Sequence, residues 1–362
     1  FVILNVILFV VGFTYTLDVD IWNYWHFAFI SGLVYMMTQN WVYSVATGLV
    51  LGLFVLVAAD WTQPAVEETF DVPGISIPHG LSAPIAIAAI PINWALDQTP
   101  LSDIEADPDT IQDRFGVMGE PVIIGVVLGL ALGIAGYWNE LGQAGNWYTI
   151  LKGSIAFAAV MHILPMMVGI LMEGLTPLSR SIRETMTDIF EGRDFSIGLD
   201  SAILIGHPSV IAASLIMVPI AVIMMMILPG NRMLWGVDLA TFPFFFALMV
   251  PIMNANIVKM VITETILLIP THYVASAVAP LVTASARSAE FEMGGKDLIT
   301  AGSDPGTLAT WILTFPMPWG LVIGLIIVFA LFGALRTWPQ TMYEIAGASE
   351  DKAQEAVELR HS

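Results

Sequence analysis

Apolar segments about as long as a membrane span recur along this chain, and they constrain its fold more than any other feature. Residues 41–59 are the clearest example, with Trp41 and Trp61 at the two ends. About 20 apolar residues in a helix cross the hydrocarbon of a lipid bilayer, and Trp side chains favour the bilayer interfaces. Of the 362 residues, 57% are hydrophobic and only 12% are charged, about half the charged share of a soluble domain. The sequence therefore predicts an all-α, polytopic membrane protein.

The remaining apolar segments divide the chain into a membrane domain, residues 1–336, and a polar tail, residues 337–362, which we expect to be mobile. Because Phe1 stands inside an apolar run, we expect the membrane sequence of the whole protein to begin upstream. Further spans are predicted at residues 1–17, 24–37, 117–137, 147–172, 242–253, 257–270, 273–282, 308–319 and 320–335, and after the break in residues 195–229.

Two apolar segments, residues 72–94 and 195–209, are interrupted by Pro and Gly. A continuous helix does not tolerate this punctuation, and irregular backbone in a membrane persists only where protein or a water-filled cavity covers it. We therefore predict two re-entrant hairpins, an arrangement that transporters place around a binding site. Residues 173–192 are polar with helically spaced apolar positions, which predicts an interfacial amphipathic helix.

Polar groups within the apolar sequence are candidates for a binding site, because they are costly in a membrane. His79 lies in the first broken segment, and Asp200 and His207 lie in the second. Imidazole and carboxylate groups can hydrogen-bond to hydroxyls. Each histidine could instead be satisfied by neighbouring backbone, and Asp200 could instead cap a helix.

Two further acids stand at the starts of predicted spans. Glu120 precedes Pro121, where the helix dipole would favour an acid as much as a substrate would. Asp304 belongs to the sequence Ser303-Asp304-Pro305-Gly306-Thr307, which is typical of a turn. We include both as candidate substrate contacts.

Other charged or imidazole groups carry simpler interpretations. His26, between Trp25 and Phe27, is expected at the membrane interface, and His162 is expected to be a buried structural residue. Glu264 lies within a span, five residues after Lys259 and poorly placed to pair with it on one helix face.

Several classes of function are disfavoured. The chain has no cysteine and a net charge of −19, so it offers no Cys-ligated metal and no basic patch for nucleic acid. We find no phosphate-binding loop, no HExxH and no GxSxG motif. No close spacing of ligands supports a metal site, and no cofactor is predicted.

The order of several short motifs resembles the galactitol family of phosphotransferase-system IIC permeases, within the ascorbate–galactitol superfamily. The resemblance covers residues 1–336, and the acidic loop, the tail and Glu264 depart from the family pattern. The motifs are Val19-Asp20-Ile21-Trp22-Asn23 with Trp25-His26; Gly74; Ile77-Pro78-His79-Gly80; Phe115-Gly116 with Gly119-Glu120-Pro121; Gly174-Leu175-Thr176-Pro177; Ile197-Gly198-Leu199-Asp200, Gly206-His207 and Ala213-Ser214-Leu215-Ile216; Pro229-Gly230-Asn231; Asp238-Leu239-Ala240-Thr241; and Ser303-Asp304 with Gly306.

The resemblance implies a homodimeric permease subunit of the cytoplasmic membrane, with re-entrant hairpins around a central polyol site. It further implies partner proteins: a IIB protein that carries a phosphocysteine, and a IIA protein that charges it. The absence of cysteine here fits this division, because the phosphoryl donor cannot lie in this chain. His79, Asp200, His207, Glu120 and Asp304 are then the candidate contacts of the polyol.

Two alternatives remain open at this point. An ion-coupled or facilitative sugar permease would use similar spans, with Glu264 or Lys259 as coupling groups. An intramembrane enzyme would need a nucleophile and base, or metal ligands, in close spacing, and the sequence shows none.

Overall fold

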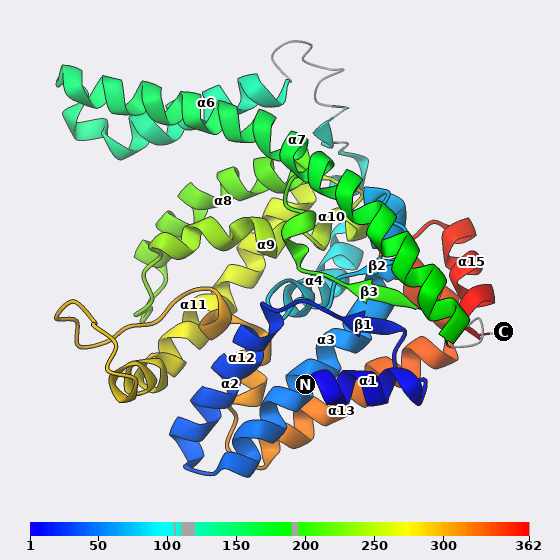
Figure 1. The fold of residues 1–362 in the computed structure, drawn as a ribbon. Coiled ribbons are helices and arrows are strands. Elements are labelled where there is room, and N and C mark those ends of the chain that lie inside the picture. The colour runs from blue at the N-terminus through cyan, green and yellow to red at the C-terminus, as the bar shows by residue number, and fades with distance from the viewer. Residues whose placement is uncertain (105, 109, 111–119, 190–194, 362) are drawn as a thin grey trace.

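The chain is mostly helical, which confirms the α-helical class (Figure 1). The computed structural model describes residues 1–104, 106–108, 110, 120–189 and 195–361. Its α-helices are α1 (Val2–Val10), α2 (Asn23–Thr38), α3 (Trp41–Phe70), α4 (Ser82–Asp97), α6 (Pro121–Gly136), α7 (Ala144–Ile189), α8 (Pro208–Ile227), α9 (Phe242–Phe246), α10 (Met249–Ile252), α11 (Ile257–Ser288), α12 (Leu308–Leu313), α13 (Trp319–Thr337), α14 (Pro339–Ile345) and α15 (Glu350–His361). Its 3₁₀ helices are η1 (Pro100–Asp103), η3 (Trp138–Glu140), η4 (Ser201–Ile203), η5 (Val237–Thr241) and η6 (Asp304–Gly306).

Within the described residues, four helices are long and apolar enough to cross a membrane: α3, α8, α11 and α13. Residues 257–270 and 273–282, predicted as two spans, form the single helix α11, which continues through Pro270 and Pro280. Packed neighbours make Pro tolerable within membrane helices. Residues 242–253 and 308–319, also predicted as spans, contain only the short helices α9, α10 and α12. At about 1.5 Å per residue these helices are too short to cross a bilayer.

Helix α7 is one continuous helix where the sequence predicted two separate elements. It runs without interruption through the predicted span at 147–172 and through most of the segment 173–192, for which an interfacial helix was predicted. Residues 190–192 lie outside the described residues.

A small parallel sheet of three short strands was not predicted. Strands β1 (Thr16–Asp18), β2 (Ile75–Ser76) and β3 (Ser196–Gly198) pair in the order β1-β3-β2. The register places Ile197 opposite both Leu17 and Ile75. Strands of two or three residues carry too little alternation to be recognised from sequence. Both broken segments thus begin as strands of one sheet.

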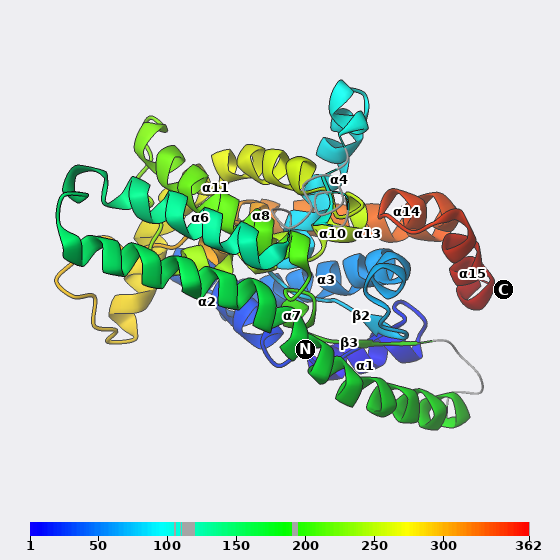
Figure 2. The same ribbon diagram turned by 90° about the horizontal axis from the view of Figure 1, so that it is seen from above.

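Helices α6 and α7 pack as an antiparallel pair along the upper edge of the molecule in Figure 1, and the view from above in Figure 2 shows the pair lying over the other helices. A glycine stripe on α6, spaced every fourth residue, makes the close approach possible. A Cβ atom on Gly125 would lie 2.8 Å from Ala158 Cα, one on Gly129 would lie 2.5 Å from Ser154 Cα, and one on Gly133 would lie 2.7 Å from Ile150 Cγ2. Small residues at this spacing allow membrane helices to approach closely.

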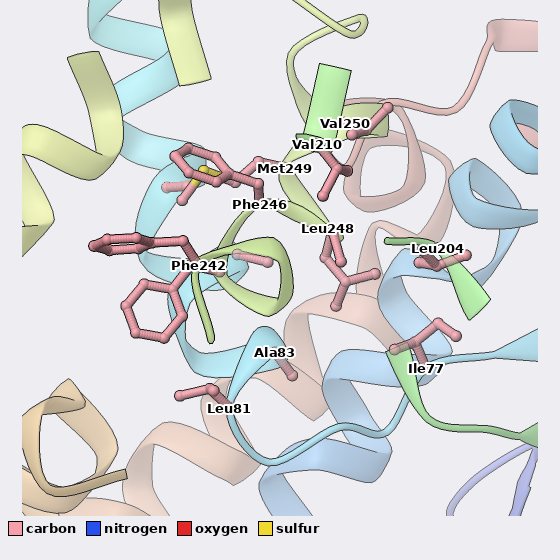
Figure 3. Close-up of a cluster of buried hydrophobic side chains, with 14 of the residues drawn as sticks. Ile77, Leu81, Ala83, Leu204, Val210, Phe242, Phe246, Leu248, Met249 and Val250 are labelled. Atoms are coloured by element: carbon pink, nitrogen blue, oxygen red, sulfur yellow. The ribbon is translucent and has the colours of Figure 1, made fainter. Parts of the chain in front are cut away.

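The main core lies where the two broken segments meet α8, α9 and α10. Ile77 from the first broken segment and Leu204 from the second are fully buried, as is Leu248 between α9 and α10. Figure 3 shows these side chains in one cluster with Phe242, Phe246 and Met249. Their burial fixes the position of both broken segments without regular helix packing.

The tail, for which the sequence suggested mobility, is helical and packed against α3. Trp61 Nε1 donates a hydrogen bond to Met342 O, and the Tyr343 ring is fully buried. Lys352 Nζ bonds Glu67 and Glu355 at 2.9 Å each. Burial lowers the pKa of Lys352, but the hydrogen bonds and the negative charges of Glu355 and Glu67 together outweigh it and raise the pKa.

The packing of the glycine stripe predicts that two Gly→Ala substitutions change the stability of the protein in opposite directions. Gly129→Ala should destabilise the protein, because overpacking costs about 1–3 kcal/mol. Gly153→Ala, on α7, is the matched control: its Cβ would meet no atom within 4 Å, so removing a helical Gly should stabilise by about 0.5–1 kcal/mol. Thermal unfolding of the purified variants measures both. Equal melting temperatures for the two variants would contradict the packing described here.

Candidate functional site

The three strands end at one place, and each is followed by side chains that can bind hydrogen-bonding ligands. Asp18 ends β1 and Asp20 follows two residues later; His79 follows β2, and Asp200 follows β3. Because the strands are parallel, their carboxyl ends share one edge of the sheet. Gly198 permits this convergence, since a Cβ there would lie 2.7 Å from Pro78 Cγ and 2.9 Å from Asp18 Cα.

The opposite end of the sheet is held by the buried carboxylate of Asp60 on α3. Both carboxylate oxygens of Asp60 accept a hydrogen bond from Tyr15 N, at 3.2 and 3.1 Å. Thr16 Oγ1 lies 2.8 Å from Asp60 Oδ1 and 2.9 Å from Ser76 Oγ. Arg360 Nη2, from the tail, donates to Ser196 Oγ at 3.1 Å. A hydrogen-bonded network thus ties all three strands to α3 and α15.

An open cavity of about 580 Å³ lies beside the carboxyl ends of the strands. This volume falls within the range of small-molecule sites. Its walls combine imidazole and carboxylate groups with hydroxyls and aromatic rings. The lining residues are Trp22, Trp25, His26, His79, Leu81, Asp200, Ala202, Thr241, Phe244, Ser303 and Asp304.

His26 and Asp304 form the closest polar pair in this cavity. His26 Nδ1 lies 2.5 Å from Asp304 Oδ1, and the two side chains are 8% and 14% exposed. His26 comes from the first turn of α2, and Asp304 begins η6, so the pair joins segments far apart in sequence. The carboxylate fixes the orientation of the imidazole and leaves Nε2 as its other hydrogen-bonding atom.

His79 is held by contacts from both broken segments. Its Nδ1 lies 3.2 Å from Ser82 N and 3.1 Å from Ser82 Oγ, and its Nε2 lies 3.8 Å from Asp200 Oδ2. Ser82 Oγ is also 2.7 Å from Ser201 Oγ. The His79 ring stacks on Phe244, with ring centres 5.5 Å apart. His79 is therefore oriented on one side by Ser82 and faces Asp200 on the other.

Asn23 fixes the turn that carries His79. Asn23 Nδ2 donates to Pro78 O at 2.5 Å and to Asp18 Oδ2 at 3.0 Å, and Gly80 N donates to Asn23 Oδ1 at 2.9 Å. Position 80 requires glycine because a Cβ there would lie 2.6 Å from His26 Cβ. The turn after β2 is thus locked to the segment after β1.

The cavity suits a neutral ligand rich in hydroxyl groups. Carboxylates accept hydrogen bonds from hydroxyls, and an imidazole donates from one nitrogen and accepts at the other. No Lys or Arg lines the cavity in the described part of the chain, so it lacks the fixed cations that bind a phosphate or carboxylate ligand. Trp22, Trp25 and Phe244 offer apolar faces to the carbon skeleton.

Three of the five predicted site residues meet in this cavity: His79, Asp200 and Asp304. Asp200 also caps η4, with Oδ1 accepting from Ala202 N at 2.6 Å, so the capping interpretation is confirmed and its role as a substrate contact stays a prediction.

The other two predicted residues begin helices and do not line this cavity. His207 precedes α8, where its Nδ1 accepts from Ser209 N at 3.2 Å, and its ring packs edge-on against Phe70. Glu120 precedes α6, and its side chain makes no capping hydrogen bond. Residues 115–119 of the Glu120 motif lie outside the described residues.

Sequence reasoning missed His26, Asp20 and Asn23 as parts of the site. His26 was assigned to the interface, but it is 7% exposed and lies against the cavity. All three fall within the family motif of residues 19–26. That family motif was the one sequence feature that could have pointed to them. Their residue types and spacing alone did not show that they lie near His79.

Long apolar helices beside an open cavity that holds polar side chains are typical of a membrane transport protein. Residues 1–297 match the family model EIIC-GAT, described as "PTS system sugar-specific permease component". Among the relatives are the "PTS system galactitol-specific EIIC component" of Escherichia coli K12, 32% identical over 93% of this chain and 74% of the relative, and the "Putative permease IIC component" of the same strain, 33% identical over 92% and 75%.

The chain therefore belongs to this family of phosphotransferase-system permease components. It is an integral membrane protein and a transporter subunit, and phosphoryl transfer takes place on separate IIA and IIB proteins. The matches give no support to the ion-coupled or facilitative alternative.

Proposed function

We propose that this chain binds a galactitol-like polyol and carries it across the cytoplasmic membrane for phosphorylation. The observation that supports this is the cavity itself, where His26, His79, Asp200 and Asp304 converge among aromatic rings. A polyol offers a hydroxyl on every carbon, and the polar groups in the cavity accept or donate to hydroxyls. The name of one relative suggests the substrate, because that protein is called galactitol-specific.

In this proposal the substrate contacts are His79, Asp200 and Asp304, joined by His26. His207 caps the start of α8, and Glu120 stands directly before α6 without a capping hydrogen bond, so neither is among these contacts. A IIB protein, charged by IIA, donates the phosphoryl group from a phosphocysteine. Because this chain has no cysteine, that thiol belongs to the partner.

We further propose that the two broken segments are re-entrant hairpins. Each enters as a short strand, turns at the cavity and continues as an apolar helix, α4 or α8. Ser82 and Ser201 join the two turns. Irregular backbone at membrane depth is stable when protein and a cavity cover it, and most residues from the strands to the turns of both segments are buried here.

Homodimer formation and an interfacial position of residues 173–189 complete the proposal. The arm formed by α6 and α7 exposes Tyr148, Ile155, Met167 and Ile170. A second copy would cover such residues within the bilayer.

The transport proposal is tested in proteoliposomes that contain the purified chain. Galactitol phosphate should accumulate inside only when IIB and phosphorylated IIA are enclosed on the side of the tail. Empty liposomes with the same enclosed proteins are the control. Accumulation of unphosphorylated galactitol without these proteins would contradict group translocation.

The contact residues are tested by calorimetric titration of galactitol. His79→Ala should weaken binding about 5- to 150-fold, because an unmade hydrogen bond to a buried polar group costs about 1–3 kcal/mol. His207→Ala is the matched histidine control outside the cavity and should change affinity less than about 3-fold, although it lowers the melting temperature by removing a helix cap. The reverse order of affinities would show that the polyol binds elsewhere.

The hairpin and dimer proposals use the absence of natural cysteines. The Ile155→Cys variant should form a disulfide between two copies in membranes, whereas Asp351→Cys on α15 should not. The Ala202→Cys variant, with its new thiol at the cavity, should react with a water-soluble maleimide and should be protected by galactitol. An Ala202→Cys thiol that never reacts would count against the hairpin proposal. An Ile155→Cys protein that stays monomeric under oxidation would count against the dimer.

A further inference from the structure

The acids at the cavity end of the sheet outnumber the cations that could neutralise them. Asp20 and Asp200 each offer a carboxylate oxygen, and these two atoms and a ring nitrogen of His79 all lie within 4.8 Å of one another. A third acid, Asp304, is paired, since its Oδ1 lies 2.5 Å from His26 Nδ1. In the described part of the chain, no Lys or Arg lines the cavity. Asp20 and Asp200 therefore give this end of the sheet an excess of negative charge.

Asp20 carries a carboxylate charge that its neighbours do not neutralise. Only 5% of this residue is exposed. Oδ1 accepts a hydrogen bond from Trp22 N at 2.8 Å, but Oδ2 is buried and has no hydrogen-bond partner. Asp20 lies outside the four helices that can span the membrane, and burial raises its pKa to about 6, so the carboxylate is mostly ionised at neutral pH. Because protein screens a charge less than water does, this carboxylate acts on ligands that it does not touch.

His79 does not neutralise these acids. Ser82 N donates a hydrogen bond to His79 Nδ1 at 3.2 Å, so Nδ1 carries a lone pair and the neutral ring holds its proton on Nε2. Nε2 lies 3.8 Å from Asp200 Oδ2, which is too far for a direct hydrogen bond. His79 thus offers the cavity one N–H donor and no full charge.

The arginines of the sheet network lie at the other end of the sheet. Arg336 and Arg360 stand over the Tyr15 ring, 5.0 and 5.1 Å from its centre. Tyr15 directly precedes β1, whereas Asp20 follows that strand. The amide of Asn23 near the cavity is neutral. Neither arginine therefore offsets the charge beside the cavity.

We propose that Asp20 and Asp200 make this cavity selective for charge, so that it binds neutral or cationic polyols and rejects a polyol that carries phosphate. A phosphate monoester carries about 1.5–2 negative charges at neutral pH, which two nearby carboxylates repel, whereas an ammonium group would be attracted. Hydrogen bonding acts in the same direction. A hydroxyl can accept from His79 Nε2 and donate to Asp200, but an ionised phosphate oxygen can only accept.

This selectivity would favour release of the product, a consequence that rests on the proposed polyol function. When IIB phosphorylates the polyol, the P–S bond of its phosphocysteine breaks and a P–O bond forms at the hydroxyl oxygen. The thiolate stays on IIB, and the hydroxyl proton passes to water. The reaction thus converts a ligand that the cavity favours into one that it rejects, and the same charges oppose rebinding of the product.

The test compares three ligands that differ at one terminal carbon: galactitol, galactitol phosphate and the analogue with an ammonium group in place of a terminal hydroxyl. Competition calorimetry on the full-length chain in detergent, at neutral pH, gives their dissociation constants. Galactitol phosphate should bind at least about 10-fold more weakly than galactitol, and the amine at least about 3-fold more tightly, because of the uncompensated carboxylates. Equal affinity for all three ligands would overturn the inference.

The Asp20→Asn variant tests the role of Asp20, because asparagine keeps the size of the side chain and an oxygen for Trp22 N. Both affinity ratios, measured within the variant, should shrink at least about 3-fold relative to the parent. Asp351→Asn, which removes an exposed carboxylate from α15, should leave both ratios unchanged. Unchanged ratios in Asp20→Asn would overturn its role. If Asp20→Asn does not fold, Asp200→Asn gives the same comparison, since its amide oxygen can still accept from Ala202 N.

The amine separates an effect of charge from an effect of size. Weak binding of galactitol phosphate, together with an amine that binds no more tightly than galactitol, would show exclusion by size and would overturn charge selectivity. Galactitol and galactitol phosphate that bind equally well would overturn the selectivity while leaving polyol binding intact. Failure of galactitol to bind the parent chain would instead overturn the proposed function.

Discussion

The meeting of three parallel strands at Gly198 is the constraint on which the rest of the site depends. The three strands are only two or three residues long, so backbone pairing alone could not hold them. A side chain at position 198 would collide with Pro78 and Asp18. At the other end, Asp60 binds the start of β1 from within α3. Because the sheet is anchored to the long apolar helix α3, the residues that follow its strands, Asp20, His79 and Asp200, are held in fixed positions.

Polar groups at the two ends of this sheet are compensated differently. At the end near α15, the carboxylate of Asp60 has arginine and hydroxyl partners, and the tail closes the network through Arg360. At the cavity end, the acids outnumber their partners: His26 matches Asp304, but one oxygen of Asp20 stays unpaired. Compensated charges at one end favour a fixed structure, whereas unpaired ones at the other favour a ligand.

Much of the fold followed from sequence patterns that have a direct physical cause. The apolar run of residues 41–59 became part of α3, and the Pro and Gly clusters marked both broken segments. Other elements could not be predicted. Helix α11 continues through two prolines because neighbouring helices pack around it, and the segment 242–253 folds into short buried helices rather than a span. The tail is ordered because Trp61 and Tyr343 bury against each other's helices.

By itself, the sequence determined that this protein lies in a lipid bilayer. It also determined the two places where helices break and the family to which the chain belongs. These depend on local composition and on motif order, which a linear chain displays directly. Only the tertiary structure decided which polar residues share one cavity. His79 and Asp200 meet there, His207 and Glu120 remain at helix starts, and His26 joins from a segment assigned to the membrane surface. The physical reason is that the pairing of strands far apart in sequence sets this proximity, and no local pattern records that pairing.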